Sequence, residues 1–212
     1  MLTRLRIRVP DRPGTLGRAA AALGTAGVDI HQVRALERTA GRAVLDLVVA
    51  LPNAMLPGVV ARMLATIPGV RVEGSWQTAE SMDIDTELEV LNEVLSMPRR
   101  AVPTLVDALP RLLHSHWALA LTVPGGTVAH ASWRAPHVVP PDLHALRARA
   151  FTAPDGTRIA VAPMGSEYAL LVGRRNAPPF HQVELHRLAT LATTVAATLS
   201  ASEHRADHSA VS

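Results

Sequence analysis

The sequence contains no cysteine and no lysine, and aromatic residues make up only 3% of its 212 positions. The absence of cysteine excludes disulfides, thiolate metal sites, iron–sulfur clusters, cysteine nucleophiles and pigments attached through a thioether. Hydrophobic residues nevertheless form 48% of the chain. A core of that size with so few aromatic rings must be built from leucine, valine, alanine and isoleucine.

The chain also lacks a long apolar run. No stretch approaches the ~18 residues that a membrane-spanning helix needs. The N-terminus alternates between apolar and polar residues from the start, without the apolar block of a secretory signal. We therefore expect a cytoplasmic protein with no membrane partner.

A strong excess of one charge is missing as well. The 21 basic residues, all arginine, exceed the 18 acidic residues by only three. The isoelectric point of about 10.8 overstates this excess, because arginine stays protonated to very high pH. A net charge of +3 supports nucleic-acid binding only weakly, and no helix-turn-helix pattern occurs. We expect no direct contact with nucleic acid.

Catalytic motifs are absent too: there is no G-x-S-x-G, no P-loop and no G-x-G-x-x-G. Ten histidines are present, and His114 and His116 form an H-x-H pair. A metal site needs three or four converging ligands, whereas these histidines are scattered, so surface and loop positions are favoured for them. The sequence predicts no cofactor, no metal and no enzymatic activity.

The first 77 residues follow a βαββαβ pattern. A strand opens the chain, and its apolar residues alternate with arginines, so one face is predicted to be buried. The arginine face is predicted to be solvated or part of a dimer interface, rather than a phosphate site. The strand's buried side is Leu5, Ile7 and Val9, and its arginine side is Arg4, Arg6 and Arg8. Helices are expected at 15–24 and 57–67, and further strands at 28–37, 43–51 and 70–76.

This order is that of the split βαβ, ferredoxin-like fold, with a four-stranded antiparallel sheet and two helices on one face. The run Asp11-Arg12-Pro13-Gly14-Thr15-Leu16-Gly17, followed by Gly27-Val28-Asp29-Ile30, resembles the signature of ACT domains. The resemblance implies binding of an amino acid or similar small molecule, without chemistry, at the interface of paired domains. The ligand-binding positions that it implies are Asp11, Arg12, Pro13, Gly14, Thr15, Leu16, Val28, Asp29 and Ile30.

The residues give this resemblance a physical basis. Amide groups at the start of a helix lack helical partners, and the helix dipole adds positive character there. A ligand carboxylate therefore suits the amides of Gly14, Thr15 and Leu16. Asp29, of the same or of the neighbouring subunit, is placed to accept from a ligand ammonium. Simpler interpretations stay open: Asp11 caps the helix, a role worth about 1 kcal/mol, Gly14 only forms a turn, and Asp29 is solvated.

The second half has a different character, after a predicted linker at 78–85. A domain at 86–203 is expected to carry helices at 86–97, 104–114, 142–149 and 182–201 around strands at 117–123, 127–133, 158–163 and 168–174. Residues 204–212 are predicted to be a disordered tail. The order of elements resembles that of a GAF domain, and the stretch 179–192 resembles the closing helix of that family. Trp117, Trp133 and Tyr168 are expected to pack in its core rather than line a pocket.

The fold class predicted for the whole chain is therefore α+β, with an N-terminal ferredoxin-like ACT domain and a C-terminal GAF-like antiparallel sheet flanked by helices. The function predicted from it is that of a non-enzymatic regulatory sensor, in which an amino acid bound at the interface of an ACT dimer signals through the GAF-like domain. The alternative is a ligand-free dimerisation scaffold that regulates a partner enzyme or transcription factor.

Overall fold

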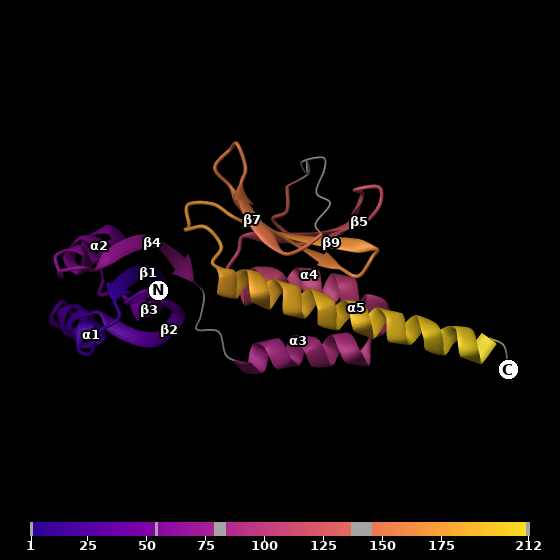
Figure 1. The fold of residues 1–212 in the computed structure, drawn as a ribbon, viewed down its shortest axis with the longest axis horizontal. Coiled ribbons are helices and arrows are strands. Elements are labelled where there is room, and N and C mark those ends of the chain that lie inside the picture. Colours follow the sequence, from indigo (N-terminus) through magenta and orange to yellow (C-terminus); the bar gives the residue numbers. More distant parts are fainter. Residues whose placement is uncertain (1, 54, 79–83, 137–145, 211–212) are drawn as a thin grey trace. The chain divides into compact units, whose positions relative to one another are not determined.

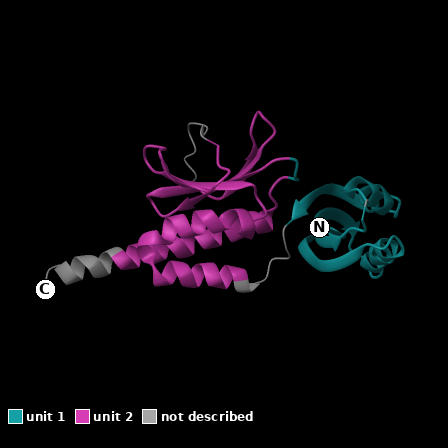
Figure 2. Ribbon diagram, turned by 180° about the vertical axis from the view of Figure 1, so that it is seen from behind, with its two compact units in different colours: residues 1–81, 176–178 teal, residues 82–175, 179–212 magenta. Residues whose placement is uncertain are grey.

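A computed structural model describes residues 2–53, 55–78, 84–136 and 146–210. The chain divides into two compact units, which Figure 2 shows in different colours. The first unit comprises Met1–Ser81 with Asn176–Pro178, and the second comprises Met82–Arg175 with Pro179–Ser212. Both units are α+β, which confirms the predicted fold class.

The first unit has the predicted βαββαβ order. Its elements are β1 (Leu2–Pro10), α1 (Thr15–Thr25), β2 (Asp29–Thr39), β3 (Arg42–Ala50), α2 (Pro57–Ala65) and β4 (Arg71–Thr78). The sheet is antiparallel with strand order β2-β3-β1-β4, and Figure 1 shows α1 and α2 beside it. β3 lies between β1 and β2, so β1 and β2 run in the same direction and β2 forms an edge of the sheet.

An aliphatic core joins this sheet to its helices. Leu5, Ile7 and Val9 alternate along β1 and are almost completely buried, as period-2 patterning predicts. Leu23 of α1 and Leu64 of α2 are fully buried against them. Because each helix presents one apolar stripe, the strand and helix periodicities together specify which sheet face is covered.

The other face of β1 differs from the expectation of a solvated stripe. Arg4 and Arg6 are only 4% and 1% exposed. Asp46 of β3 lies directly opposite Arg6, and Arg6 donates from Nε to Oδ1 at 2.8 Å and from Nη2 to Oδ2 at 2.9 Å. Trp76 adds an aromatic face 5.5 Å from the Arg6 guanidinium. This bidentate pairing compensates the loss of hydration, so burial of the arginine is possible.

The second unit contains five strands rather than the four that were predicted. Its elements are α3 (Ile84–Ser96), the 3-10 helix η1 (Pro98–Arg100), α4 (Ala101–Leu112), β5 (Trp117–Thr122), β6 (Val128–Ala131), β7 (Arg149–Thr152), β8 (Arg158–Met164), β9 (Tyr168–Arg174) and α5 (Gln182–Ala210). The sheet order is β6-β5-β9-β8-β7, with all neighbours antiparallel.

Three sequence-based boundaries change in this unit. A helix was expected at 142–149. Residues 142–145 lie outside the described part of the chain, residues 146–148 are not helical, and β7 begins at Arg149. The helix expected at 104–114 is α4, which spans Ala101–Leu112 and contains Pro110. The last helix runs to Ala210, through residues for which we predicted a tail.

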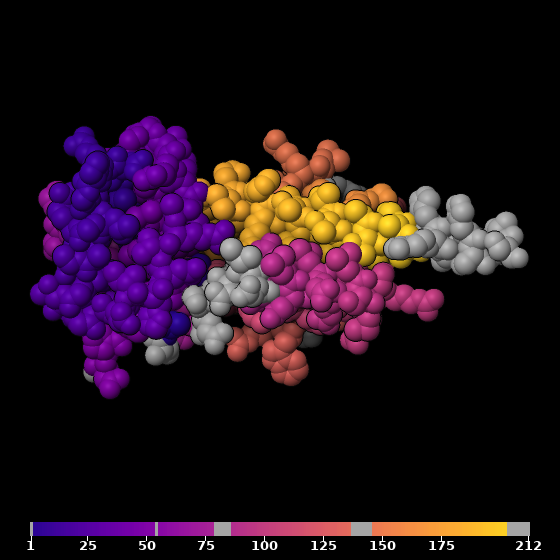
Figure 3. Space-filling view, turned by 90° about the horizontal axis from the view of Figure 1, so that it is seen from below, coloured from indigo at the N-terminus to yellow at the C-terminus, as the bar shows by residue number. Residues whose placement is uncertain are grey.

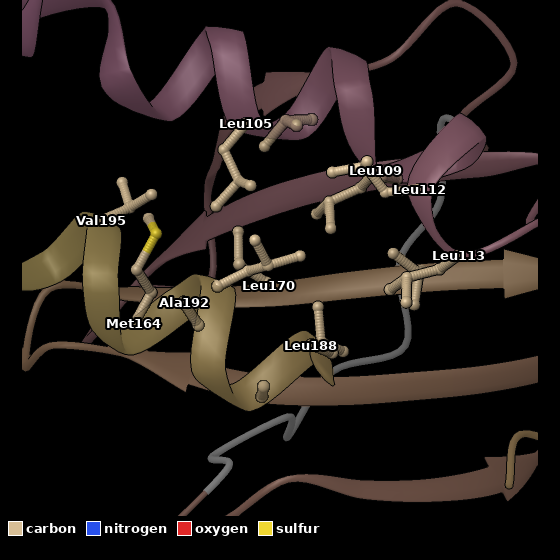
Figure 4. Packing of buried hydrophobic residues seen from close by; sticks show 14 of the residues in the cluster. Leu105, Leu109, Leu112, Leu113, Met164, Leu170, Leu188, Ala192 and Val195 are labelled. Carbon is tan, nitrogen blue, oxygen red and sulfur yellow. The ribbon is translucent and has the colours of Figure 1, made fainter. Parts of the chain in front are cut away.

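The core of the second unit lies between its sheet and its helices. Figure 4 shows Leu105 and Leu109 of α4, Leu170 of β9, and Leu188 and Val195 of α5 gathered in one cluster. All five side chains are fully buried. Figure 3 shows α3 and α5 side by side on the helical face of the unit. Phe180 is the single aromatic ring among the buried residues of this cluster, and the other members are aliphatic apart from Met164, as the composition predicted.

Three aromatic residues of the second unit differ in how far they are buried. Trp117 is buried, as expected, and packs in a second apolar cluster on the opposite face of the sheet. Tyr168 is half-buried against the main core. Trp133, by contrast, is 97% exposed, so the expectation of core packing was wrong for it. Trp133 follows β6 in a turn, where a side chain is not directed into the sheet's core.

Candidate functional site

The turn between β1 and α1 carries the signature residues and has the geometry of an open helix N-terminus. Gly14 occupies the N-cap position with φ of 81°, and no side chain caps the helix. This left-handed conformation favours glycine because it has no Cβ. Asp11 therefore does not cap α1, which corrects the first of the simpler interpretations. Its carboxylate instead pairs with Arg38, with 3.1 Å between Oδ1 and Nη2.

The amides at this helix start are accessible. The carbonyl of Arg12 accepts from the Thr15 N–H at 3.2 Å, and that of Gly14 accepts from the Arg18 N–H at 3.0 Å. Within the described residues, the N–H groups of Leu16 and Gly17 then have no backbone partner. A Cβ built on Gly14 or Gly17 would meet no atom within 4 Å. In the single chain, the α1 N-terminus is therefore open to a ligand.

The second part of the predicted site lies at the start of β2. Asp29 has a side chain that is 78% exposed, and its Oδ2 lies 3.5 Å from Nε2 of His31. The pairing of β2 with β3 shifts register between Ile30 and Gln32, so His31 lies at an irregularity of the strand where it contacts Asp29. Val28 is buried in the core of the unit, and Ile30 packs against that core. Their side chains face inward, which leaves their backbone as the part accessible to a ligand.

The strand register separates these two parts within one chain. Pro10, at the end of β1, pairs with Arg42 at one end of β3. Asp29 pairs with Ala50 at the other end of β3. At about 3.4 Å per residue, the two ends of β3 are roughly 27 Å apart. One chain therefore does not bring Asp29 to the helix start at Gly14.

The sequence reasoning missed the two residues that contact these aspartates. β1 and β2 are parallel with β3 between them, so their C-terminal ends lie at the same edge of the sheet. That topology was already predicted, and it is the signal that places Arg38, near the end of β2, beside Asp11. His31 lies only two positions from Asp29, but the irregular pairing of β2 at this point was not signalled by the sequence.

The remaining positions of the signature serve the turn. Arg12 and Pro13 are exposed, whereas Thr15 is buried, and its hydroxyl oxygen lies 3.5 Å from an Arg18 guanidinium nitrogen. No group of three or more histidine or acidic side chains converges on a metal-sized site anywhere in the described ranges. The predicted H-x-H pair is therefore not part of such a group, and His137 and His144 lie outside the described residues.

Comparisons with known proteins do not assign the chain to a family. No family model matches the chain, and neither does any curated protein. A formyltetrahydrofolate deformylase from Pseudomonas putida KT2440 is similar over 47% of this chain, with 15% identity and a TM-score of 0.30. This chain spans 38% of that structure's length. An unknown protein from Galdieria sulphuraria is similar over 93% of this chain and 90% of its own, with 14% identity and a TM-score of 0.34.

These likenesses are too distant to carry an argument about function. None of the described helices is long and apolar enough to cross a membrane.

Proposed function

We propose that the protein is a non-enzymatic regulatory sensor, whose N-terminal unit binds an amino acid or a similar small metabolite between two copies of the chain. The second unit, which we propose is GAF-like, passes the signal to a partner. The strand register carries this proposal. It separates Asp29 from the open helix start in one chain, so a complete site needs a second chain.

The edge strand β2 supplies a way to complete the site. β2 lies at the edge of its sheet, and an exposed edge is a template for pairing with another strand. Two β2 strands that pair antiparallel about a two-fold axis bring the start of one beside the end of the other. Asp29 of the partner subunit then approaches Arg38 and Asp11, next to the α1 N-terminus.

The chemistry of such a paired site suits a zwitterion. The N–H groups of Leu16 and Gly17 and the helix dipole favour a carboxylate. Gly14 lets that carboxylate come close to the backbone. Asp29 of the partner subunit accepts from the ammonium group, in exchange for its contact with His31. A hydrogen bond to a charged group contributes about 1.5–3 kcal/mol, so several together give selective binding.

A thermal-shift screen of the full chain against the twenty amino acids tests the proposal. A ligand at ten times its Kd stabilises the folded state by about 1.4 kcal/mol. For a unit of this size, that raises Tm by roughly 6–11 °C. Asp29→Ala is expected to abolish the shift, whereas Glu89→Ala, which removes an exposed carboxylate from α3, is expected to retain it. A folded dimer whose Tm responds to none of the twenty contradicts amino-acid sensing.

A ligand-free scaffold is the second candidate, and one observation favours it. Each aspartate of the site already has a neighbour within the chain, the guanidinium of Arg38 for Asp11 and the imidazole of His31 for Asp29. A scaffold predicts a stable oligomer with no ligand response and with assembly unchanged by Asp29→Ala. Light scattering coupled to size exclusion, with and without the amino-acid panel, separates the two candidates.

A further inference from the structure

A polar group of side chains lies where β5 begins and β9 ends, in the second unit. The Nδ1 atom of His116 accepts the backbone N–H of Arg175 at 3.0 Å. A neutral imidazole with an accepting Nδ1 carries its proton on Nε2. His116 is an exposed residue, and Nε2–H is the donor that its neutral ring offers to a ligand. The His116 N–H itself donates to the carbonyl of Gly173 at 2.8 Å, which fixes the backbone of the histidine on the sheet.

The turn after β6 is anchored beside this histidine. Ser132 donates its N–H to the Ala118 carbonyl at 2.9 Å, and its Oγ accepts the Ala118 N–H at 2.8 Å. Ala118 lies two residues after His116, so the turn that carries Trp133 and Arg134 is held at the same end of β5. Trp133 is 97% exposed and Arg134 is also exposed. An indole side chain is large and mostly apolar, and here it is presented to solvent next to a guanidinium.

The electrostatics of the group favour an anion. Partial desolvation of the imidazole lowers the pKa of His116, and the charges of Arg134, Arg174 and Arg175 lower it further. Arg174 is paired with Glu184 and Arg175 with Asp155. For Arg134, no ion-pair partner occurs within the described residues. The positive charge next to the neutral imidazole is therefore available to a ligand.

The same contacts disfavour an amino acid here. Asp155 reaches the group through Arg175, whose Nη2 donates to Oδ2 of the aspartate at 2.5 Å. It also accepts the Thr157 N–H at 3.0 Å and the Thr157 hydroxyl at 2.8 Å. Its lone pairs are thus engaged, and a ligand ammonium would face arginines instead.

We propose that Trp133, Arg134 and His116 form a binding site for a small aromatic anion without an ammonium group. The aromatic ring stacks on the indole of Trp133. Its phosphate or carboxylate accepts from the Arg134 guanidinium, whose planar fork matches either group, and from Nε2–H of His116. This site lies wholly in the second unit and is separate from the proposed amino-acid site, so either proposal can fail without the other.

Titration calorimetry of the full chain with phenyl phosphate and, separately, with phenylacetate tests this proposal. We expect saturable binding of at least one probe, and the preferred probe identifies the anionic group. Trp133→Ala and Arg134→Gln are each expected to weaken binding by about tenfold or more. Arg99→Gln, which removes an exposed guanidinium from η1 of the same unit, is expected to leave binding unchanged.

Trp133 and Arg134 are both exposed, so their substitution is expected to leave the fold intact. Far-UV circular dichroism of each variant checks this. Failure of both probes to bind at millimolar concentration overturns the proposal. Binding that survives either site substitution without loss also overturns it.

Discussion

Replacement of Gly173 by alanine tests the packing of the second sheet at a single atom. Gly173 of β9 lies directly opposite Trp117 of β5. A Cβ at this position would lie 2.1 Å from both Cε2 and Cζ2 of the indole. Gly173 lies within an ordinary strand and its φ is not positive, so alanine fits the backbone and only the side-chain clash opposes it.

Two opposing effects decide the size of the change. Alanine in place of glycine reduces the entropy of the unfolded chain, which stabilises the native state by about 0.5–1 kcal/mol. Against this, Trp117 is only 8% exposed and must retreat until its ring is in ordinary contact. Overpacking of this kind costs about 1–3 kcal/mol. The difference between the two effects is roughly 0–2.5 kcal/mol in the direction of the clash. Because the new Cβ would lie as close as 2.1 Å to the indole, Gly173→Ala is expected to destabilise the second unit.

A double-mutant cycle in urea, followed by far-UV circular dichroism, measures this effect. Leucine lacks the indole atoms that the new Cβ would meet. In a Trp117→Leu background, Gly173→Ala is accordingly expected to stabilise the second unit. The transition to follow is the one whose midpoint Trp117→Leu itself changes. Equal destabilisation in both backgrounds would show that the indole does not cover Gly173, and the packing argument would fail.

Three further outcomes follow from the two units. Asp46→Asn leaves the buried Arg6 guanidinium without its bidentate partner and is expected to cost about 3–5 kcal/mol in thermal unfolding; a loss below about 1 kcal/mol contradicts a buried pair. Leu105→Ala, at a fully buried position, is expected to cost about 2–5 kcal/mol, whereas Leu88→Ala at an exposed one is expected to cost far less, and similar losses would refute the assigned core. Because the pKa of His116 is lowered from 6.5 in the folded protein, its unfolded form binds protons more readily, so stability is full above pH 6.5 and falls as pH drops through the folded pKa. Urea unfolding measures the free energy of unfolding above pH 6.5 and again below the folded pKa of His116. His116→Gln is expected to reduce the difference between the two free energies, and an unchanged difference would exclude His116 as its cause.

The topology of the first unit was predictable from the sequence because its signals are local. The alternation of Leu5, Ile7 and Val9 requires only the two-residue period of a strand. The glycine at position 14 marks a turn whose backbone favours that residue. β7 was missed because its four residues are mostly exposed and carry little alternation to read.

The candidate site was only partly predictable. The sequence indicated the helix start at Gly14 and the carboxylate of Asp29, since both are single-residue signals within a recognisable pattern. It did not indicate that these lie at opposite ends of β3, because that depends on which residues pair across strands. The predicted strand order does bring the end of β2 to the same edge as the end of β1, but only the tertiary structure shows that Asp11 and Arg38 themselves pair.

The sequence by itself determined the α+β class, the aliphatic nature of both cores and the order of elements in the first unit, because hydrophobic periodicity acts between residues close in the chain. Only the tertiary structure decided the environment of individual side chains. Arg6 is buried because Asp46, forty positions away in the chain, lies opposite it, and Trp133 is exposed because its turn lies outside the sheet. Such environments arise from neighbours that are distant in sequence, and composition and periodicity carry no information about those neighbours.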